Sequence, residues 1–211
     1  MHHCGTKSIT TSRLVLRPLT IDDAEMMFNN WANDPEVTRY LRWPPHRSWP
    51  ESAEILNEWS KHYIDPGFYQ WGITERKTGI LFGSMSVFKA APNAGWRFDA
   101  APLGEAWEAG YCIGRKWWGR GLATEALCAV RDYWFTGTDS PWLTCLHDIE
   151  NVASGAVMQK AGFRYDHDAT DHKFDGTAVP CRVYFITRED WNELQRAEQC
   201  ENAGPDAGNN A

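Results

Sequence analysis

The chain has 211 residues, enough for one domain with a buried core, and its 43% hydrophobic and 23% charged residues are ordinary for a globular protein. A net charge of −7 argues against a general nucleic-acid binder, whose binding face would be basic. No apolar run reaches the ~18–20 residues of a membrane helix, and the N-terminus lacks a signal-peptide layout. The sequence therefore predicts a cytoplasmic protein that binds neither nucleic acid nor membrane.

The first half of the chain alternates between strand and helix patterns. Residues 1–9 are expected to form a flexible leader. Thr20 is a good helix N-cap, and the pair Asp34-Pro35 ends the helix that Thr20 begins. The predicted elements, in chain order, are a strand at 13–19, helices at 20–33 and 50–63, and strands at 69–75 and 80–89.

The second half begins with a long segment, 90–106, that is rich in Ala, Pro and Gly. Loops of this length are uncommon unless they are functional or disordered. A polar loop containing Asp175-Gly176 joins the last two strands, and residues 193–211 are expected to be a largely disordered tail. The predicted elements are a strand at 107–113, a helix at 119–136, a strand at 142–147, a helix at 152–161, and strands at 163–167 and 182–187.

The most informative segment is 116–126, Lys-Trp-Trp-Gly-Arg-Gly-Leu-Ala-Thr-Glu-Ala, which follows a strand and opens a helix. The glycines at 119 and 121 allow a tight turn and let the backbone approach a ligand closely. The first N–H groups of a helix lack intrahelical partners, and the helix dipole places partial positive charge there. Because cationic side chains also surround the turn, this segment predicts an anion site for a phosphorylated cofactor.

Two common phosphate-binding motifs do not fit this segment. A Walker A loop needs Gly-x4-Gly-Lys-Ser/Thr, which the sequence does not supply. A dinucleotide fingerprint needs a third glycine where Thr124 stands, and no second β-α-β unit follows. The segment therefore indicates another class of phosphorylated cofactor.

The segment resembles motif A of the GNAT superfamily of acyl-CoA-dependent N-acyltransferases, Gln/Arg-x-x-Gly-x-Gly/Ala, with Lys116 in the first position. A lone Gly-x-Gly would be a weak signal, but further similarities run in order through residues 10–192. The segments that are similar to the ribosomal-protein N-terminal (alanine/serine) acetyltransferase branch are 11–18, 108–111, 118–126, 151–154, 160–163 and 184–191.

The resemblance implies a single α/β (α+β) domain at 10–192 with the GNAT fold: a mixed, twisted central sheet of about six to seven strands, flanked by helices and split between its middle strands. It also implies acetyl-CoA as the acyl-donor cosubstrate, no metal, and direct transfer of acetyl to a primary amine. The backbone N–H of Cys112 or a neighbour would hold the thioester oxygen. The residues carried over to cofactor binding are Tyr111, Cys112, Ile113, Arg115, Lys116, Gly119, Arg120, Gly121, Leu122, Ala123, Thr124 and Asn151.

The resemblance also supplies a catalytic candidate for each proton transfer in amine acylation. Glu108, on the strand before the turn, is the candidate general base, acting directly or through water, with Glu105 as a weaker competitor. Ser154 is the candidate acid for the departing thiolate, and Tyr165 stays open as an alternative. The plain structural interpretation is that Glu108 is a solvated or salt-bridged strand residue and that Asn151 caps a helix in which Ser154 fills the first turn.

The sequence does not decide the acceptor, which could be a protein N-terminus or a small-molecule amine. An acidic chain with several tryptophans in its first third suits either acceptor, and the 90–106 segment is expected beside the acceptor entrance. A non-catalytic CoA-binding sensor or scaffold of the same fold is the alternative function. A binder of a phosphate ligand unrelated to CoA would require every downstream similarity to be accidental. A homodimer stays open beside a monomer.

The histidines and cysteines do not predict a metal site. The six cysteines have no paired spacing, which favours free thiols over disulfides or a zinc site. His147 adjoins Asp148, and a second acidic and histidine-containing group at 167–172 is expected to be solvated in a loop.

Overall fold

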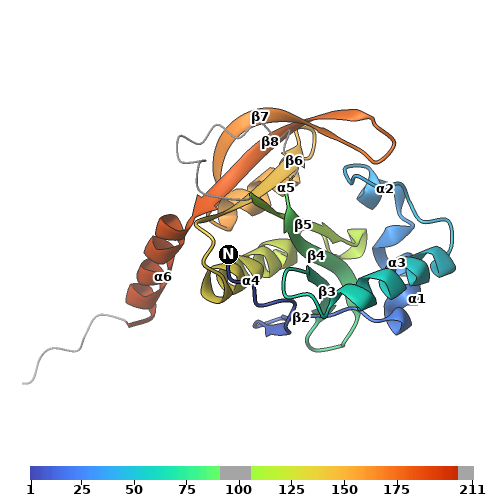
Figure 1. The fold of residues 1–211 in the computed structure, drawn as a ribbon, viewed down its shortest axis with the longest axis horizontal. Helices are drawn as coiled ribbons and strands as arrows, with labels where there is room; N and C mark the ends of the chain where they lie inside the picture. Colours follow the sequence, from blue (N-terminus) through green and yellow to red (C-terminus); the bar gives the residue numbers. More distant parts are fainter. Residues whose placement is uncertain (91–105, 204–211) are drawn as a thin grey trace, which may run out of the picture.

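One sheet of eight strands forms the centre of the protein, slightly more strands than the six to seven expected (Figure 1). The structure, a computed structural model, describes residues 1–90 and 106–203. Glu105 and nearly all of the 90–106 segment therefore lie outside the described residues. In the described part of the chain, no helix is long and apolar enough to cross a membrane.

The predicted strands and helices occur in the predicted order with differences at several ends, and the structure adds β1, α2 and α6. The strands are β1 Ile9–Thr10, β2 Leu14–Arg17, β3 Tyr69–Glu75, β4 Leu81–Lys89, β5 Trp107–Ile113, β6 Trp142–Asp148, β7 Arg164–His172 and β8 Ala178–Thr187. The α-helices are α1 Ala24–Met27, α2 Pro35–Thr38, α3 Trp49–His62, α4 Leu122–Gly137, α5 Val152–Lys160 and α6 Arg188–Ala203. Short 3-10 turns span Ile21–Asp23 and Arg115–Trp117, and a π-helical turn spans Phe28–Ala32.

The sheet divides between β5 and β6. Its order is β1-β2-β3-β4-β5-β6-β8-β7, and every neighbouring pair is antiparallel except β5 with β6. In the described residues the parallel ladder holds one paired position, Glu108 with Thr144, whereas β4 and β5 pair from Gly83–Ile113 to Lys89–Trp107. The two strands therefore separate beyond Glu108, as expected for a sheet that is split between its middle strands.

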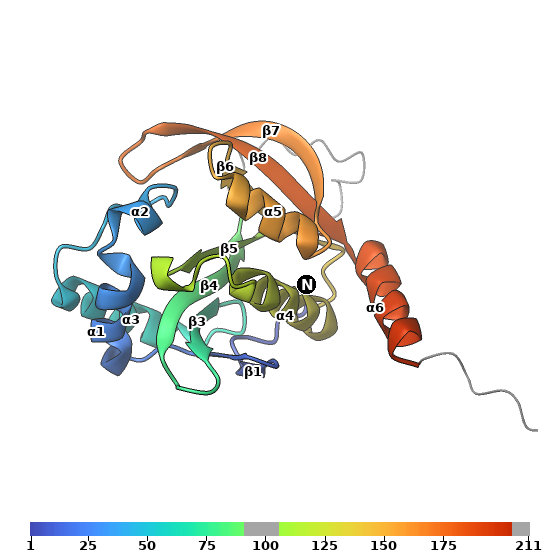
Figure 2. The ribbon, with the colours of Figure 1, turned by 180° about the vertical axis from the view of Figure 1, so that it is seen from behind.

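Strand alternation supplies apolar side chains to a core on each face of the sheet. Ala109 and Ile113 of β5 pack in the larger core with α4, whereas Cys112 packs in a second core with α1 and α3. Figure 2 shows α4 and α5 in front of the strands on the first face. The helices thus fix β5 from both sides and leave its end at the division of the sheet.

The glycine turn ends β5 and delays the start of α4. Gly119 and Gly121 both have φ of +72°, a left-handed conformation that a helix cannot contain. The helix expected from residue 119 therefore begins at Leu122.

The loop between β7 and β8, the C-terminal tail and the N-terminal leader depart from the sequence interpretation. β7 and β8 extend through most of the expected polar loop and meet at a turn containing Asp175-Gly176, a pair typical of hairpins. Part of the expected disordered tail, residues 193–203, belongs to α6, because the chain there is rich in good helix formers and Trp191 stacks on Phe135 with ring centroids 5.5 Å apart. Residues 204–211 lie outside the described residues.

Residues expected in a flexible leader are hydrogen-bonded to the domain. Cys4 N donates to the Tyr69 hydroxyl at 3.1 Å, and Gly5 N donates to Pro66 O at 2.8 Å. Thr6 Oγ1 donates to Phe68 O at 2.8 Å. The leader thus packs along the start of β3.

Candidate active site

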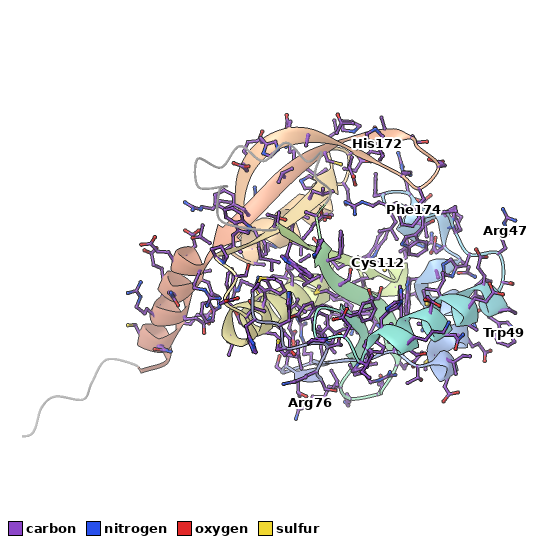
Figure 3. All side chains as sticks on the ribbon, viewed as in Figure 1. Arg47, Trp49, Arg76, Cys112, His172 and Phe174 are labelled. Atoms are coloured by element: carbon purple, nitrogen blue, oxygen red, sulfur yellow. The ribbon has the colours of Figure 1, made fainter. Side chains whose placement is uncertain are left out.

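A cavity of about 780 Å³ opens where β5 and β6 separate. Its floor is formed by β4 and β5, and its walls come from the 40–46 segment, α3, the N-terminus of α5 and the β7–β8 hairpin. Figure 3 shows Cys112 on the sheet and His172 and Phe174 on the hairpin, and all three residues line the cavity. The division of the sheet and the space beside it therefore form one continuous site.

Glu108 is the buried acid of this cavity. The residue is 4% exposed, and its Oε1 accepts a hydrogen bond from Arg42 Nη2 at 3.0 Å. Burial raises the pKa of Glu108 to about 7, an effect that Asp171 increases and Arg42 opposes. A carboxyl group with this pKa is matched to general-base chemistry near neutral pH.

Arg42 and Asp171 complete an ionic cluster that the sequence did not reveal. Arg42 Nε donates to Asp171 Oδ2 at 2.6 Å, so that one guanidinium binds two carboxylates. Asp171 was placed in a solvated loop, but it lies on β7 and lines the cavity. The polar sequence of β7 has no apolar alternation, so the Asp175-Gly176 turn was the one available signal for this strand.

Tyr111 and Ser154 face each other across the division of the sheet. Their hydroxyl oxygens are 2.8 Å apart, and the Tyr111 hydroxyl also lies 3.1 Å from Ser154 O. Burial raises the pKa of Tyr111 well above its ordinary value, so the phenol keeps its proton. Asn151 Oδ1 accepts from Ser154 N at 3.3 Å, which makes Asn151 the cap of α5 as well as a residue of the cavity lining. Two hydroxyl protons are therefore held beside the cavity.

The structure separates Tyr165 from this site. Tyr165 lies on β7, is 50% exposed, and donates to Asp168 Oδ1 at 3.1 Å. It is not among the described residues that line the cavity, whereas Ser154 is.

Backbone geometry distinguishes the N–H group of Cys112 from those of its neighbours. Gly114 N donates to Phe82 O at 2.8 Å, and Cys112 pairs with Ser84 in the same antiparallel register. Alternation along an antiparallel pair then directs the Cys112 N–H toward β4, and the neighbouring Tyr111 and Ile113 N–H groups toward β6. The Cys112 side chain is a buried thiol 3.3 Å from Ser84 Oγ, and burial raises its pKa.

The glycine turn presents its backbone to solvent beside β5. A Cβ added to Gly119 would meet no atom within 4 Å, and at Gly121 it would lie 3.6 Å from Arg13 Nη2. The side chains of Ile113 and Leu122 are buried in the larger core, so these two residues can offer a ligand only their backbone. Ala123 and Thr124 are half-buried at the start of α4.

Surface ion pairs surround this turn. Arg115 Nε lies 3.0 Å from Asp34 Oδ2, and Arg120 Nη2 lies 3.2 Å from Glu75 Oε1. Both arginines are exposed, and exposed pairs of this kind are weak. Lys116 is also exposed, and among the described residues it has no ion-pair partner.

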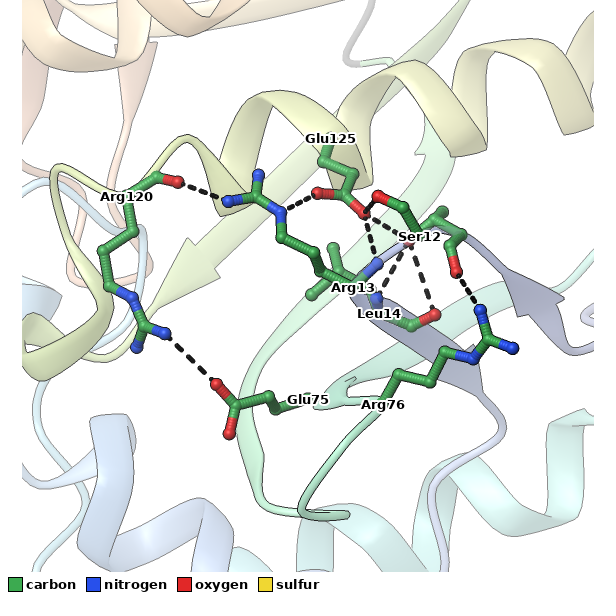
Figure 4. Close-up of polar contacts among 8 residues, drawn as sticks. Ser12, Arg13, Leu14, Glu75, Arg76, Arg120 and Glu125 are labelled. Atoms are coloured by element: carbon green, nitrogen blue, oxygen red, sulfur yellow. Dashed lines mark hydrogen bonds and ion pairs between the residues drawn. The ribbon is translucent and has the colours of Figure 1, made fainter.

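Glu125 anchors the turn to the N-terminal segment (Figure 4). Its carboxylate accepts hydrogen bonds from Thr11 Oγ1, Ser12 Oγ, and the backbone N and Nε of Arg13, at 2.5 to 3.0 Å. Arg13 Nη1 also donates to Arg120 O at 2.9 Å. These bonds assign Glu125 a structural role and hold the glycine turn in place.

Of the predicted site residues, Glu108, Tyr111, Cys112, Asn151 and Ser154 come together at the cavity. Ile113, another predicted cofactor residue, ends β5, and the remaining ones lie on the adjoining turn and the start of α4. Within the described residues, no group of three or more His, Cys, Asp or Glu side chains could hold a metal ion.

Comparisons with known proteins agree with this geometry. The family model described as acetyltransferase (GNAT) domain matches residues 13–164. The chain is 28% identical over 181 residues to an uncharacterized N-acetyltransferase, YoaA, of Bacillus subtilis (strain 168), with 85% of this chain and 96% of that protein covered. It is 26% identical over 193 residues to the ribosomal protein uS5-alanine N-acetyltransferase of Escherichia coli (strain K12), with 87% and 92% covered.

A solved structure extends the similarity to the fold. The crystal structure of the microcin C7 self-immunity acetyltransferase MccE, in complex with acetyl-CoA and AMP, matches with a TM-score of 0.68 at 14% identity, covering 84% of this chain and 93% of that one. The fold, the site and the matches define an acyltransferase of the N-acetyltransferase class. The chain belongs to the GNAT acetyltransferase family.

Proposed function

We propose that the protein transfers an acetyl group from acetyl-CoA to a primary amine that binds in the cavity beside Glu108. The observation that carries this proposal is the position of Glu108, a buried carboxyl with a pKa of about 7 at the point where the sheet divides. Acetyl-CoA supplies the acyl group as a thioester, and the residues around the division perform the proton transfers.

The glycine turn is the proposed seat for the pyrophosphate of acetyl-CoA. The open space at Gly119 and the exposed backbone N–H groups before α4 fit an anionic group, which the helix dipole and Lys116 favour. Arg115 and Arg120 add positive charge, because their exposed ion pairs can exchange for a phosphate at small cost. The pantetheine arm then continues between β5 and β6, past Asn151 and the described lining of the cavity.

Each proton transfer of the proposed acetylation has a candidate residue in the cavity. Glu108 takes the proton that the amine loses as its nitrogen bonds to the acyl carbon. The N–H groups of Tyr111 and Ile113 face β6, where they can hold the developing negative charge on the acyl oxygen. The hydrogen-bonded pair of Tyr111 and Ser154 protonates the thiolate as its bond to the acyl carbon breaks.

The acceptor end of the cavity is mixed in character. Trp43, Trp59 and Phe88 supply aromatic surface, and Glu108 and Asp171 supply negative charge. Negative charge in a cleft raises the local concentration of a cationic amine. Both peptide N-termini and small-molecule amines meet this description, so both belong in the test.

The test combines cofactor binding with turnover. Calorimetric titration with acetyl-CoA, followed by thiol-release assays on pools of amines and N-terminal peptides, is expected to show binding and release with at least one pool. Glu108→Gln is expected to lower turnover by ~10²–10⁴ while the affinity for acetyl-CoA stays nearly unchanged. Binding without release from any pool would support a CoA-binding sensor instead, and absence of binding would overturn the proposal.

A further inference from the structure

The Arg42 guanidinium is held on two edges and one face. Nη2 binds Glu108 Oε1 at 3.0 Å, Nε binds Asp171 Oδ2 at 2.6 Å, and the group lies over the Phe88 ring, 5.2 Å from its centroid. The side chains of Arg42, Glu108 and Asp171 are 27%, 5% and 19% exposed, so the cluster is largely shielded from solvent. Fixed, shielded ion pairs act more strongly on a neighbouring group than surface pairs do.

The hairpin also contacts the backbone on either side of this cluster. Phe174 N donates to Arg42 O at 2.8 Å, and Lys173 Nζ donates to Arg39 O at 2.7 Å. Figure 1 shows the β7–β8 hairpin reaching from the far edge of the sheet toward α2. Two hydrogen bonds to the 39–42 segment and one ion pair thus join the hairpin to the residue that binds the base.

We propose that Arg42 is a positioning residue that increases the ionised fraction of Glu108 at neutral pH, and that the β7–β8 hairpin holds Arg42 in place through Asp171. A protonated Glu108 cannot accept a proton from the amine, so ionisation of this buried group decides how much enzyme is competent. This inference rests on the proposed function of Glu108 as the base.

Among the described groups around Glu108, Arg42 supplies the positive charge that balances the Glu108 carboxylate. β4 contributes the uncharged Phe88 opposite Glu108, and β6 contributes the buried thiol of Cys145, whose pKa burial raises well above its ordinary value. β8 contributes the thiol of Cys181, whose pKa burial raises to about 11. Asp171 on β7 is negative, so among the described groups that face Glu108 the positive charge comes from Arg42.

The test compares the pH dependence of kcat/KM in four proteins: the parent, Arg42→Gln, Arg42→Lys and Arg39→Gln. An opposite charge within ~4–6 Å lowers a carboxyl pKa by ~1–3, so Arg42→Gln should lower kcat/KM at pH 7 by about fivefold or more, with recovery as the pH rises past the raised pKa of Glu108. Arg42→Lys keeps the charge and should restore part of the loss. Arg39→Gln removes the same charge from an exposed pair with Glu150 and should follow the parent.

A titration of the free protein separates this inference from the proposed function. Carbon-13 NMR of labelled Glu carboxyls, with Glu108→Gln to assign the signal, should show Glu108 titrating at higher pH in Arg42→Gln than in the parent. An unchanged titration in a folded Arg42→Gln protein, or an equal loss of kcat/KM at every pH, would overturn the inference. If acetyl transfer were absent altogether, the NMR titration would still test the role of Arg42.

Discussion

Replacing Glu108 by glutamine is expected to stabilise the folded protein at alkaline pH while it abolishes most activity. Glu108 has a folded-state pKa of about 7, raised from an ordinary value of 4.5 by burial. A carboxyl whose pKa is raised on folding contributes stability that is fully present below the unfolded pKa and is lost as the pH rises through the folded pKa. Between pH 5 and pH 9 the parent should therefore lose about 2.5 kcal/mol that Glu108→Gln does not lose.

Thermal unfolding of the two proteins at pH 5 and pH 9 measures this difference. For a chain of 211 residues, about 2.5 kcal/mol corresponds to a change of about 5–10 °C in the Tm of Glu108→Gln relative to the parent. Glu150→Gln, which neutralises an exposed carboxylate, controls for the loss of one negative charge. A Tm difference between Glu108→Gln and the parent that is the same at both pH values would refute the argument that Glu108 ionises at a cost in the folded state.

Two further predictions concern the binding of acetyl-CoA and the protonation of its departing thiolate. Gly121→Asp should abolish acetyl-CoA binding by calorimetry, because it adds a side chain and a negative charge at a φ of +72°. Gly79→Asp makes the same change at the same φ in the open turn between β3 and β4 and should bind acetyl-CoA normally. Tyr111→Phe should lower kcat by ~10-fold or more by removing one hydroxyl of the proton-donating pair, whereas Tyr165→Phe should not. Normal binding by a folded Gly121→Asp protein, or equal kcat values for the two tyrosine variants, would contradict these assignments.

Local sequence patterns were sufficient to predict the strand β5 and the glycine turn after it, whereas the roles of their residues came from the family resemblance. The strand before Gly119 and Gly121, with Glu108 near its start, was predicted from alternation and turn chemistry, and the structure has β5 at the predicted residues. The N-terminus of α5 was likewise marked by Asn151, a good cap. These features depend on neighbours in sequence, which is why a single chain reveals them.

The other half of the site depends on contacts between distant segments. Arg42 lies just before the proline pair at 44–45, outside any predicted element, and Asp171 lies in a strand whose polar residues show no alternation, so neither position carries a local signal. The two residues meet only because the long hairpin reaches the 39–42 segment. A distant contact also supports α6, because Trp191 stacks on Phe135 of α4.

The separation of β5 and β6 also affects the stability of the enzyme. In the described residues β5 and β6 pair at one position, so the two halves of the sheet share few backbone hydrogen bonds. This seam, the boundary between β5 and β6, is where local unfolding is expected to begin. Under the proposed function, acetyl-CoA lies along this seam and binds only the closed form. At one hundred times its Kd such a ligand adds about 2.7 kcal/mol to the free energy of unfolding. Loss of acetyl-CoA would then lower the free energy of unfolding by the same amount.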